Sequence, residues 1–204
     1  RDLDGETQVR AIGERAFSGC TGISSVSMSE NLVTISAWAF DGCSGITGKL
    51  TFTNKVAAIG RNAFSGTGIT SVYIPKSITS SAISSSSSYT SEGPFYNTGL
   101  TTIEYEEGIT SIAPGLFRGC TRLTDIIIPD SVTSIGNDAF NGCTGLTNIT
   151  ISNNLTNIGA SAFKGCTSIT GELIMPNSVI TLGERAYSGC TGISSVSMSE
   201  NLVT

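Results

Sequence analysis

The chain has 204 residues, a formal net charge of −5 at pH 7, only 13 % charged residues and no histidine. The negative balance argues against a nucleic-acid-binding protein, which needs a basic stripe, and no apolar run approaches the roughly 20 residues of a membrane-spanning helix. The lack of histidine removes the usual general base and the commonest metal ligand. We therefore expect no enzyme, with no catalytic, metal or cofactor site.

The rest of the sequence is built on one repeated unit, seen best at residues 123–145, which read LTDIIIPDSVTSIGNDAFNGCTG. The other segments are imperfect copies of it, about 23 residues apart. One such unit cannot bury its own apolar face, so a fixed period of 20 to 30 residues indicates a solenoid of stacked coils.

Each unit predicts three local elements in chain order. Leu123, Ile126 and Ile128 follow the L-x-x-L-x-L spacing of a leucine-rich repeat, and their alternation with polar positions predicts a strand. Pro129 ends that strand because it has no amide hydrogen for the ladder. A second short extended piece follows at 132–135, and the remainder predicts one helical turn.

Two columns run through the eight copies. The first is aromatic: Phe17, Phe40, Phe64, Phe95, Phe117, Phe140, Phe163 and Tyr187. The second lies two residues later: Gly19, Gly42, Gly66, Asn97, Gly119, Gly142, Gly165 and Gly189. Seven glycines and one asparagine predict a left-handed residue that closes the turn, because other side chains are strained there.

The predicted fold is a β-rich repeat solenoid of the α/β leucine-rich repeat type, with about eight stacked coils in one domain over residues 1–204. The aromatic spacings are 23, 24, 31, 22, 23, 23 and 24. The two spacings of 24 contain an extra residue and a glycine at 46–52 and 169–175, which predicts β-bulges. The spacing of 31 contains a serine-rich insertion, 79–93, which we interpret as a loop. It is either a tolerated insertion or a binding or O-glycosylated loop.

The two ends of the chain are copies of each other. Residues 13–34 recur at 183–204 with one change, from Phe17 to Tyr187. Neighbouring units share only their pattern, so this near-identity indicates a higher-order repeat of seven coils. We expect the chain to be a slice of a longer array.

The six cysteines are also spaced by the repeat period and occupy one column: Cys20, Cys43, Cys120, Cys143, Cys166 and Cys190. The close C-x-x-C pairs typical of zinc sites are absent. Two interpretations stay open, namely buried free thiols that act as small hydrophobes, and disulfide bridges between neighbouring coils.

The pattern L-T-x-I-x-I-P-x-x-V-T-x-I-G-x-x-A-F-x-G-C-T resembles the BspA-like class of leucine-rich repeats. The resemblance covers essentially the whole chain and is weakest at 1–8 and 79–93. Members of that class are mostly secreted or surface-exposed, so the resemblance implies adhesion, matrix binding or co-aggregation at the cell surface. It implies no catalysis and brings no ligand residues with it.

The exposed face of the main sheet is the default binding surface, since positions between the apolar residues point outward. The candidate residues on this face are Tyr73, Glu104, Asp125, Ile127, Asn148, Glu172 and Ile174. Trp38, the only tryptophan, either anchors a neighbouring chain or folds over the adjacent coil. Asn148 and Asn154 begin N-x-T sequons and are candidate glycosylation sites.

Three functions are compatible with these features. The first is an extracellular or cell-surface scaffold that mediates adhesion by binding a protein or glycoprotein. The alternative is a structural segment of an extracellular filament or cell coat, in which copies of about 170 residues join end to end. An intracellular scaffold is favoured only if the six thiols are reduced in the native source.

Overall fold

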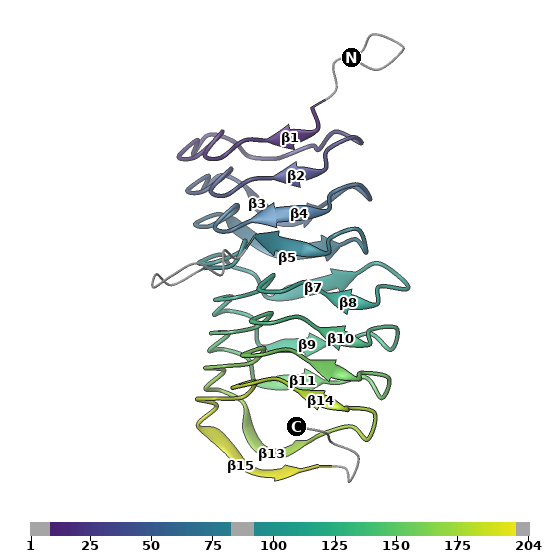
Figure 1. The fold of residues 1–204 in the computed structure, drawn as a ribbon. Helices are drawn as coiled ribbons and strands as arrows, with labels where there is room; N and C mark the ends of the chain where they lie inside the picture. The colour runs from purple at the N-terminus through teal and green to yellow at the C-terminus, as the bar shows by residue number, and fades with distance from the viewer. Residues whose placement is uncertain (1–8, 83–91, 199–204) are drawn as a thin grey trace.

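The computed structural model describes residues 9–82 and 92–198, which form fifteen short β-strands and no helix. The chain winds into eight coils that stack along one axis, from the purple coils at one end to the yellow coils at the other (Figure 1). The prediction of a β-rich repeat solenoid is confirmed. A coil has three sides, which carry a main strand, a short strand and a series of turns, and the first coil has an extended segment without strand pairing in place of the main strand.

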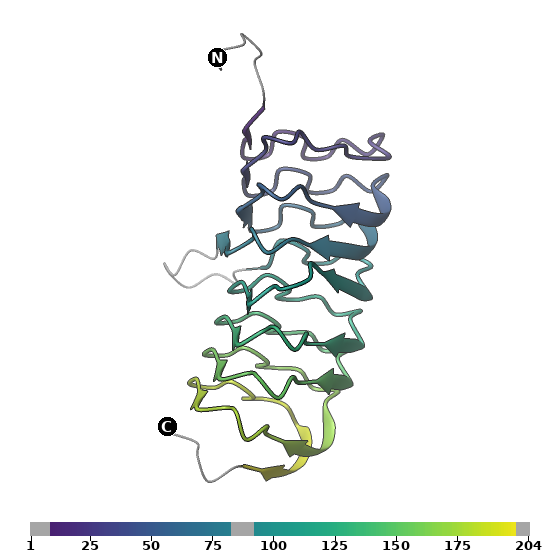
Figure 2. The ribbon, with the colours of Figure 1, turned by 90° about the vertical axis from the view of Figure 1, so that its right-hand side faces the viewer.

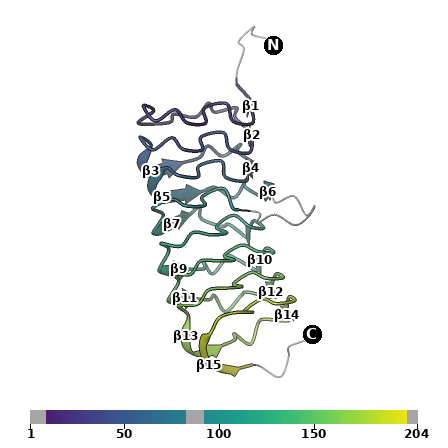
Figure 3. The ribbon, with the colours of Figure 1, turned by 90° about the vertical axis from the view of Figure 1, so that its left-hand side faces the viewer.

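The main strands form the longer side of each coil and pair in parallel. They make three sheets, with strand orders β3-β5-β7, β9-β11 and β13-β15. Figures 2 and 3 show these strands along one side of the stack and the short strands on the other. The main strands are β3 (Thr47–Thr51), β5 (Gly68–Ile74), β7 (Thr102–Tyr105), β9 (Asp125–Ile127), β11 (Asn148–Thr150), β13 (Thr170–Ile174) and β15 (Gly192–Ser197).

The short strands form two parallel sheets, with orders β1-β2-β4-β6 and β8-β10-β12-β14. Their bounds are β1 (Ala11–Ile12), β2 (Thr34–Ile35), β4 (Ala58–Gly60), β6 (Ser80–Ala82), β8 (Ser111–Ile112), β10 (Ser134–Ile135), β12 (Asn157–Ile158) and β14 (Thr181–Leu182). Ser80–Ala82 lies inside the segment expected to be a serine-rich loop, yet it pairs with β4. Residues 83–91 of that loop lie outside the described residues.

The third side corrects the sequence prediction, because the expected helical turn is absent from every described coil. In the coil of Phe140, alternate amides point in different directions. Phe140 and Gly142 donate to carbonyls of the next coil at 2.8 Å, whereas Asn141 and Cys143 donate within their own coil at 3.1 Å. A helix would keep every amide within its own coil. The turns instead use half of the amides to join neighbouring coils.

The left-handed residues explain why this side forms turns. The predicted glycine column is confirmed, since all seven glycines and Asn97 have a positive φ, between 53° and 79°. The sequence did not predict a second left-handed column, four residues earlier, with φ between 52° and 59°. Its members are Arg15, Trp38, Asn62, Gly115, Asp138, Ser161 and Arg185. A right-handed helix cannot run through such a residue.

The aromatic column forms a continuous stack through the core. Neighbouring rings lie 5.1–6.1 Å apart between centroids, with interplanar angles of 3–19°. The widest steps, 5.8 and 6.1 Å, are on either side of Phe95, next to the inserted segment. Isoleucine, leucine, valine and alanine side chains fill the rest of the core. Each coil therefore packs on its neighbours through one shared aromatic ladder.

We predict that Phe140→Ala lowers the free energy of unfolding by about 3–5 kcal/mol, the usual cost of removing a buried aromatic ring. Phe140 is fully buried between Phe117 and Phe163. The matched control is Phe17→Ala, in which the ring is 40 % exposed and stacks on one neighbour. Urea unfolding of both variants should give a loss at least twice as large for Phe140. Equal losses would contradict a ladder that stabilises through burial.

Candidate functional site

The candidate binding residues lie on the outward face of the main sheets, as the strand alternation requires. Six of the seven are exposed and Tyr73 is half-buried. The structure places Asp125 beside Asn148 across β9 and β11, and Tyr73 beside Glu104 across β5 and β7. The seven residues do not form one cluster, because they are spread over several coils.

Polar contacts on this face join side chains within and between coils. Lys49 pairs with Glu104 at 2.7 Å, reaching over β5, and both side chains are about half exposed. Asp125 accepts hydrogen bonds from Thr124 and Asn148, each at 2.6 Å. These two bonds lower the pKa of Asp125 below its ordinary value. The carboxylate therefore stays charged at neutral pH.

Two large apolar side chains point into solvent on the same face. Ile127 is 71 % exposed and Ile174 is 67 % exposed. Both occupy outward positions that are polar in most other coils. Thr150 on β11, the register partner of Ile127, lies on the strand between them. Scattered exposed isoleucines are common on proteins, but two on a surface that otherwise carries mostly serine and threonine are the strongest apolar feature of this face.

The main sheet is interrupted at two places that the sequence did not predict. No pairing joins β7 to β9 or β11 to β13, although each strand pairs with its other neighbour. The clefts have volumes of about 400 Å³ between β7 and β9 and about 730 Å³ between β11 and β13. The inward-pointing Ile103, Ile149 and Leu173 beside them are only half-buried, whereas Val72 in the continuous part of the sheet is fully buried.

The interruptions follow from the length of each coil between its aromatic anchor and its main strand. The first outward residue of that strand, or of the equivalent unpaired segment in the first coil, lies 8, 9, 7, 7, 8, 8, 9 and 8 positions after the anchor: Ser25, Lys49, Ser71, Thr102, Asp125, Asn148, Glu172 and Ser195. Where two successive coils have the same anchor-to-strand length, their main strands pair in register. Where the length decreases, the pairing continues through a register shift, at Gly48/Lys49 and at Gly171/Glu172, which confirms the predicted bulges. Where it increases, the described strands do not pair.

Trp38 occupies the left-handed column on the turn side, away from the main sheet. Its half-buried ring lies between the guanidinium groups of Arg15 and Arg61, 4.3 and 4.1 Å from the ring centroid. Each such cation–π contact contributes about 0.5–1 kcal/mol at an exposed site. The ring thus packs over both adjacent coils, and its contact with a neighbouring chain stays a prediction.

The cysteines form the expected column, and all six are free thiols in the structure. Five are buried, and each donates to the backbone carbonyl of the aromatic anchor one coil earlier, as Cys143 does to Phe117 at 3.1 Å. In the coils without cysteine, Thr67 and Thr98 donate to their own anchor's carbonyl instead. Burial raises the pKa of the buried thiols, so they are poor nucleophiles.

The two sequons are on the surface. Asn148 lies in β11 and Asn154 in the turn that follows, and both side chains are exposed. The amide of Asn148 is bonded to Asp125, and that of Asn154 donates to the carbonyl of Asp130 at 2.9 Å. Glycosylation of either one stays a prediction.

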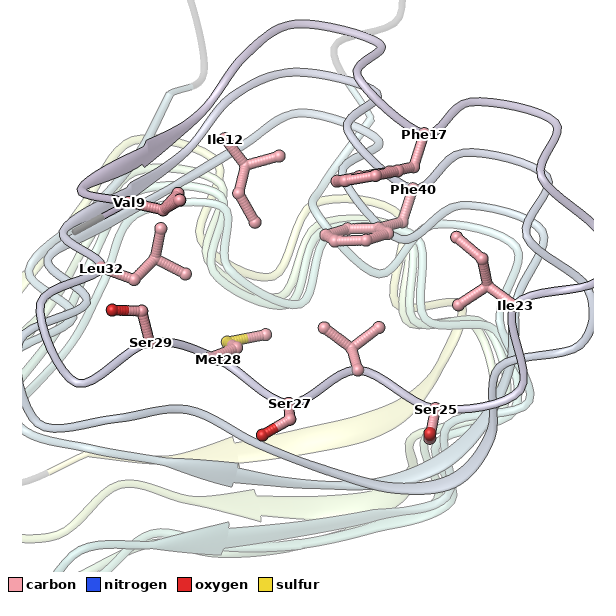
Figure 4. A pocket seen from close by; sticks show the side chains of 11 residues that line it. Val9, Ile12, Phe17, Ile23, Ser25, Ser27, Met28, Ser29, Leu32 and Phe40 are labelled. Carbon is pink, nitrogen blue, oxygen red and sulfur yellow. The ribbon is translucent and has the colours of Figure 1, made fainter. Parts of the chain in front are cut away.

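The first coil has an open apolar end. Figure 4 shows Ile12, Phe17 and Ile23 pointing into a hollow of about 380 Å³, with the ring of Phe40 beneath that of Phe17. The last described coil has a second hollow of similar volume, with Leu182, Tyr187 and Ile193 at the equivalent positions. In the described part of the chain, no coil covers either hollow.

Within residues 9–82 and 92–198, no group of three or more cysteine, aspartate or glutamate side chains is arranged to hold a metal ion. The same residues include no helix that is long and apolar enough to cross a membrane.

Comparison with known proteins gives one family match. The model of the BspA-type leucine-rich repeat region matches residues 2–121 and 88–204, so it takes in nearly the whole chain. Among curated proteins, none matches the sequence.

Several solved structures resemble this fold. A leucine-rich repeat protein from Bacteroides ovatus superposes with a TM-score of 0.72 at 26 % identity, over 95 % of this chain and 48 % of that protein. The leucine-rich repeat protein of T. pallidum gives a TM-score of 0.52 at 24 % identity, over 85 % of this chain and 66 % of that one. The chain therefore spans about half to two thirds of the length of these two proteins.

The thiol column predicts a dependence of stability on pH. Burial raises the pKa of the five buried thiols in the folded state, whereas unfolded cysteines ionise near pH 8.5. Above that pH the unfolded state binds fewer protons, so stability should fall as pH rises, by up to about 1.4 kcal/mol per pH unit for each thiol. Urea unfolding at pH 7.5 and 9.5 measures the effect. Replacing the five buried cysteines by alanine should remove most of the pH dependence of the free energy of unfolding. An unchanged dependence would show that other titrating groups cause it.

Proposed function

Because the chain belongs to the BspA-type leucine-rich repeat family, we propose that it is a non-enzymatic scaffold at the cell surface or outside the cell, which mediates adhesion by binding a protein or glycoprotein. Repeat solenoids bind partners through their extended faces. The observation that carries the proposal is the exposed main-sheet face, where Ile127 and Ile174 stand in solvent close to the charged Asp125 and Glu172.

The surface composition supports a protein partner. Residues of the main-sheet face are mostly small and polar, so few charged groups of this face have to lose their hydration when a partner binds. A few apolar and aromatic side chains usually supply most of the affinity of such a contact. On this face the large ones are Tyr73, Ile127 and Ile174. The family resemblance supports the location outside the cell.

We predict that the double variant Ile127→Ser, Ile174→Ser binds its partner about tenfold more weakly, which corresponds to about 1.4 kcal/mol. The chain and the variant are tested against immobilised matrix glycoproteins and intact host cells by surface plasmon resonance and cell adhesion. The matched control is Ile180→Ser, which removes an exposed isoleucine (49 % exposed) from another side of the coil. If the parent chain adheres to neither surface, the adhesion proposal fails.

The second candidate function is a structural segment of a filament or cell coat. Its supporting observation is the pair of apolar hollows, whose coils carry nearly the same sequence at 13–28 and 183–198. The end of one copy presents apolar side chains, and so does the start of another. Stacking them would continue the aromatic ladder from Tyr187 onto a second Phe17.

We predict that end-to-end association, if it forms the filament, is abolished by Phe17→Glu, because a carboxylate would be buried in the stacked ring column. Sedimentation velocity over a hundredfold concentration range, with electron microscopy of the densest sample, measures association. Ile180→Glu is the control with the same charge change on a side surface and should associate as the parent does. A parent that is monomeric at every concentration would eliminate the filament.

A further inference from the structure

The cleft between β11 and β13 is wide as well as unpaired. Every Cα–Cα separation between these two strands is greater than 8 Å. The coils nevertheless stay joined on their other two sides, where Asn157 pairs with Thr181 and the amide of Ser161 donates to the carbonyl of Glu184 at 2.8 Å. The opening is therefore confined to the main-sheet side of the molecule.

A separation of more than 8 Å excludes direct pairing of β11 with β13 and is of the order that one intervening strand requires. Paired strands lie about 4.7–4.9 Å apart, so two strands with a third between them are separated by about 9.5 Å. The cleft has a volume of about 730 Å³. The half-buried side chains of Ile149, Ile151 and Leu173 line it and provide apolar surface for inward-pointing side chains of an added strand. The cleft between β7 and β9 is narrower, because some of its Cα atoms lie within 8 Å.

Both walls of the cleft present backbone groups. The amide of Asn148 donates to Thr124 at 3.1 Å and the carbonyl of Thr150 accepts from Ile128 at 2.9 Å, so these residues face β9. Because alternate residues of a strand face opposite neighbours, the amide and carbonyl of Ile149 face the cleft.

The same reasoning applies to the opposite wall. The amide of Met175 donates to Ser197 of the next coil at 2.9 Å. The backbone groups of Glu172 and Ile174 therefore face the cleft. Unpaired edges of this kind are templates for an incoming strand.

The side chains around the cleft define the chemistry of its occupant. Asp125 and Glu172 bring two carboxylates to it, and no lysine or arginine lines it. Ile174 and Pro176 add apolar surface at the rim. The electrostatic complement is an extended segment with a lysine or arginine on its outward side, and the half-buried isoleucines favour small apolar residues on its inward side.

We propose that this cleft binds an extended segment of the protein partner by strand addition between β11 and β13, with apolar side chains inward and a lysine or arginine beside Asp125 and Glu172. The bound stretch matches the walls, which are three and five residues long. The proposal rests on the protein-binding function above and assigns its site.

The test uses a blocked synthetic peptide that alternates valine and threonine, with one lysine at a central outward position. Hydrogen exchange by NMR reports each backbone amide. Saturating peptide should slow exchange of the Ile149 and Ile174 amides at least tenfold and leave that of Ile128, which is already bonded, unchanged. A peptide N-methylated at alternate amides should give no protection. Ile149 and Ile174 amides that are unaffected by the unmodified peptide would overturn the proposal.

Two variants test whether the interruption itself makes the site. Deletion of Gly171 gives this coil the same anchor-to-strand length as its two neighbours, so β13 should pair with β11 and peptide affinity should fall at least tenfold. Deletion of Gly48 makes the equivalent change at the other bulge, remote from the cleft, and should leave the affinity within twofold. Equal affinities for the two deletion variants would contradict the site.

A charge variant keeps the test valid if the deletion of Gly171 prevents folding. Glu172→Lys should weaken binding of the lysine peptide about tenfold, whereas Thr51→Lys, at an exposed outward position on β3, should not. Failure of this proposal is distinguishable from failure of the adhesion proposal. If the chain binds glycoproteins while Glu172→Lys and the peptide have no effect, the adhesion proposal stands and the cleft proposal falls. If the peptide binds as described and the chain adheres to no surface, the cleft proposal stands and the adhesion proposal falls.

Discussion

Stacking of each coil on the next is the interaction on which the rest of the structure depends. It has two components, the aromatic ladder in the core and the alternate amides on the turn side that bond to the neighbouring coil. An aromatic pair contributes about 0.5–1.5 kcal/mol beyond the burial of its area, and the amide bonds fix the axial position of each ring. Both components persist at the wider interruption, between β11 and β13, where the amides of Phe140 and Gly142 donate to the next coil and the ring of Phe140 stacks on that of Phe163. The sheet side can therefore open without separating the coils.

Coil length then decides where the sheet is continuous. The anchor is held in the ladder, so a residue added between anchor and strand displaces the strand and does not move the ring. The coil of Phe163 has one extra residue, and Gly171, within β13, has a φ of +81° at the register shift. The next strand, β15, pairs with β13 through the register shift at Gly171/Glu172. The preceding strand, β11, does not pair with β13. Single-residue changes in length thus produce local surface features on an otherwise uniform scaffold.

The sequence predicted the features that are set by short-range chemistry. The repeat period, the aromatic column, the left-handed glycines and both bulges depend on residue type at fixed spacing, and the structure confirms them. The helical turn was wrong because Asp138 and its equivalents are left-handed, and arginine, tryptophan or serine at that position gives no compositional signal. The interruptions were missed because they depend on the difference in length between two successive coils, although the numbers were present in the spacing. The candidate residues do point outward from the main sheets, but which of them lie beside a cleft depends on the strand register, which the sequence alone did not reveal.

The composition of the main-sheet face explains why an interruption is a better place for binding than the continuous sheet. A flat face of serine and threonine buries little apolar area, and its hydroxyls exchange water for partner groups with little net gain. Long-range attraction is weak as well, since charged residues are only 13 % of the chain. An open strand edge supplies affinity through backbone groups that any extended partner can satisfy, and it needs none of the tryptophan or arginine side chains that usually dominate interfaces. The residues beside that edge, Asp125, Glu172 and Ile174, then have only to select among extended segments, which a few exposed side chains are sufficient to do.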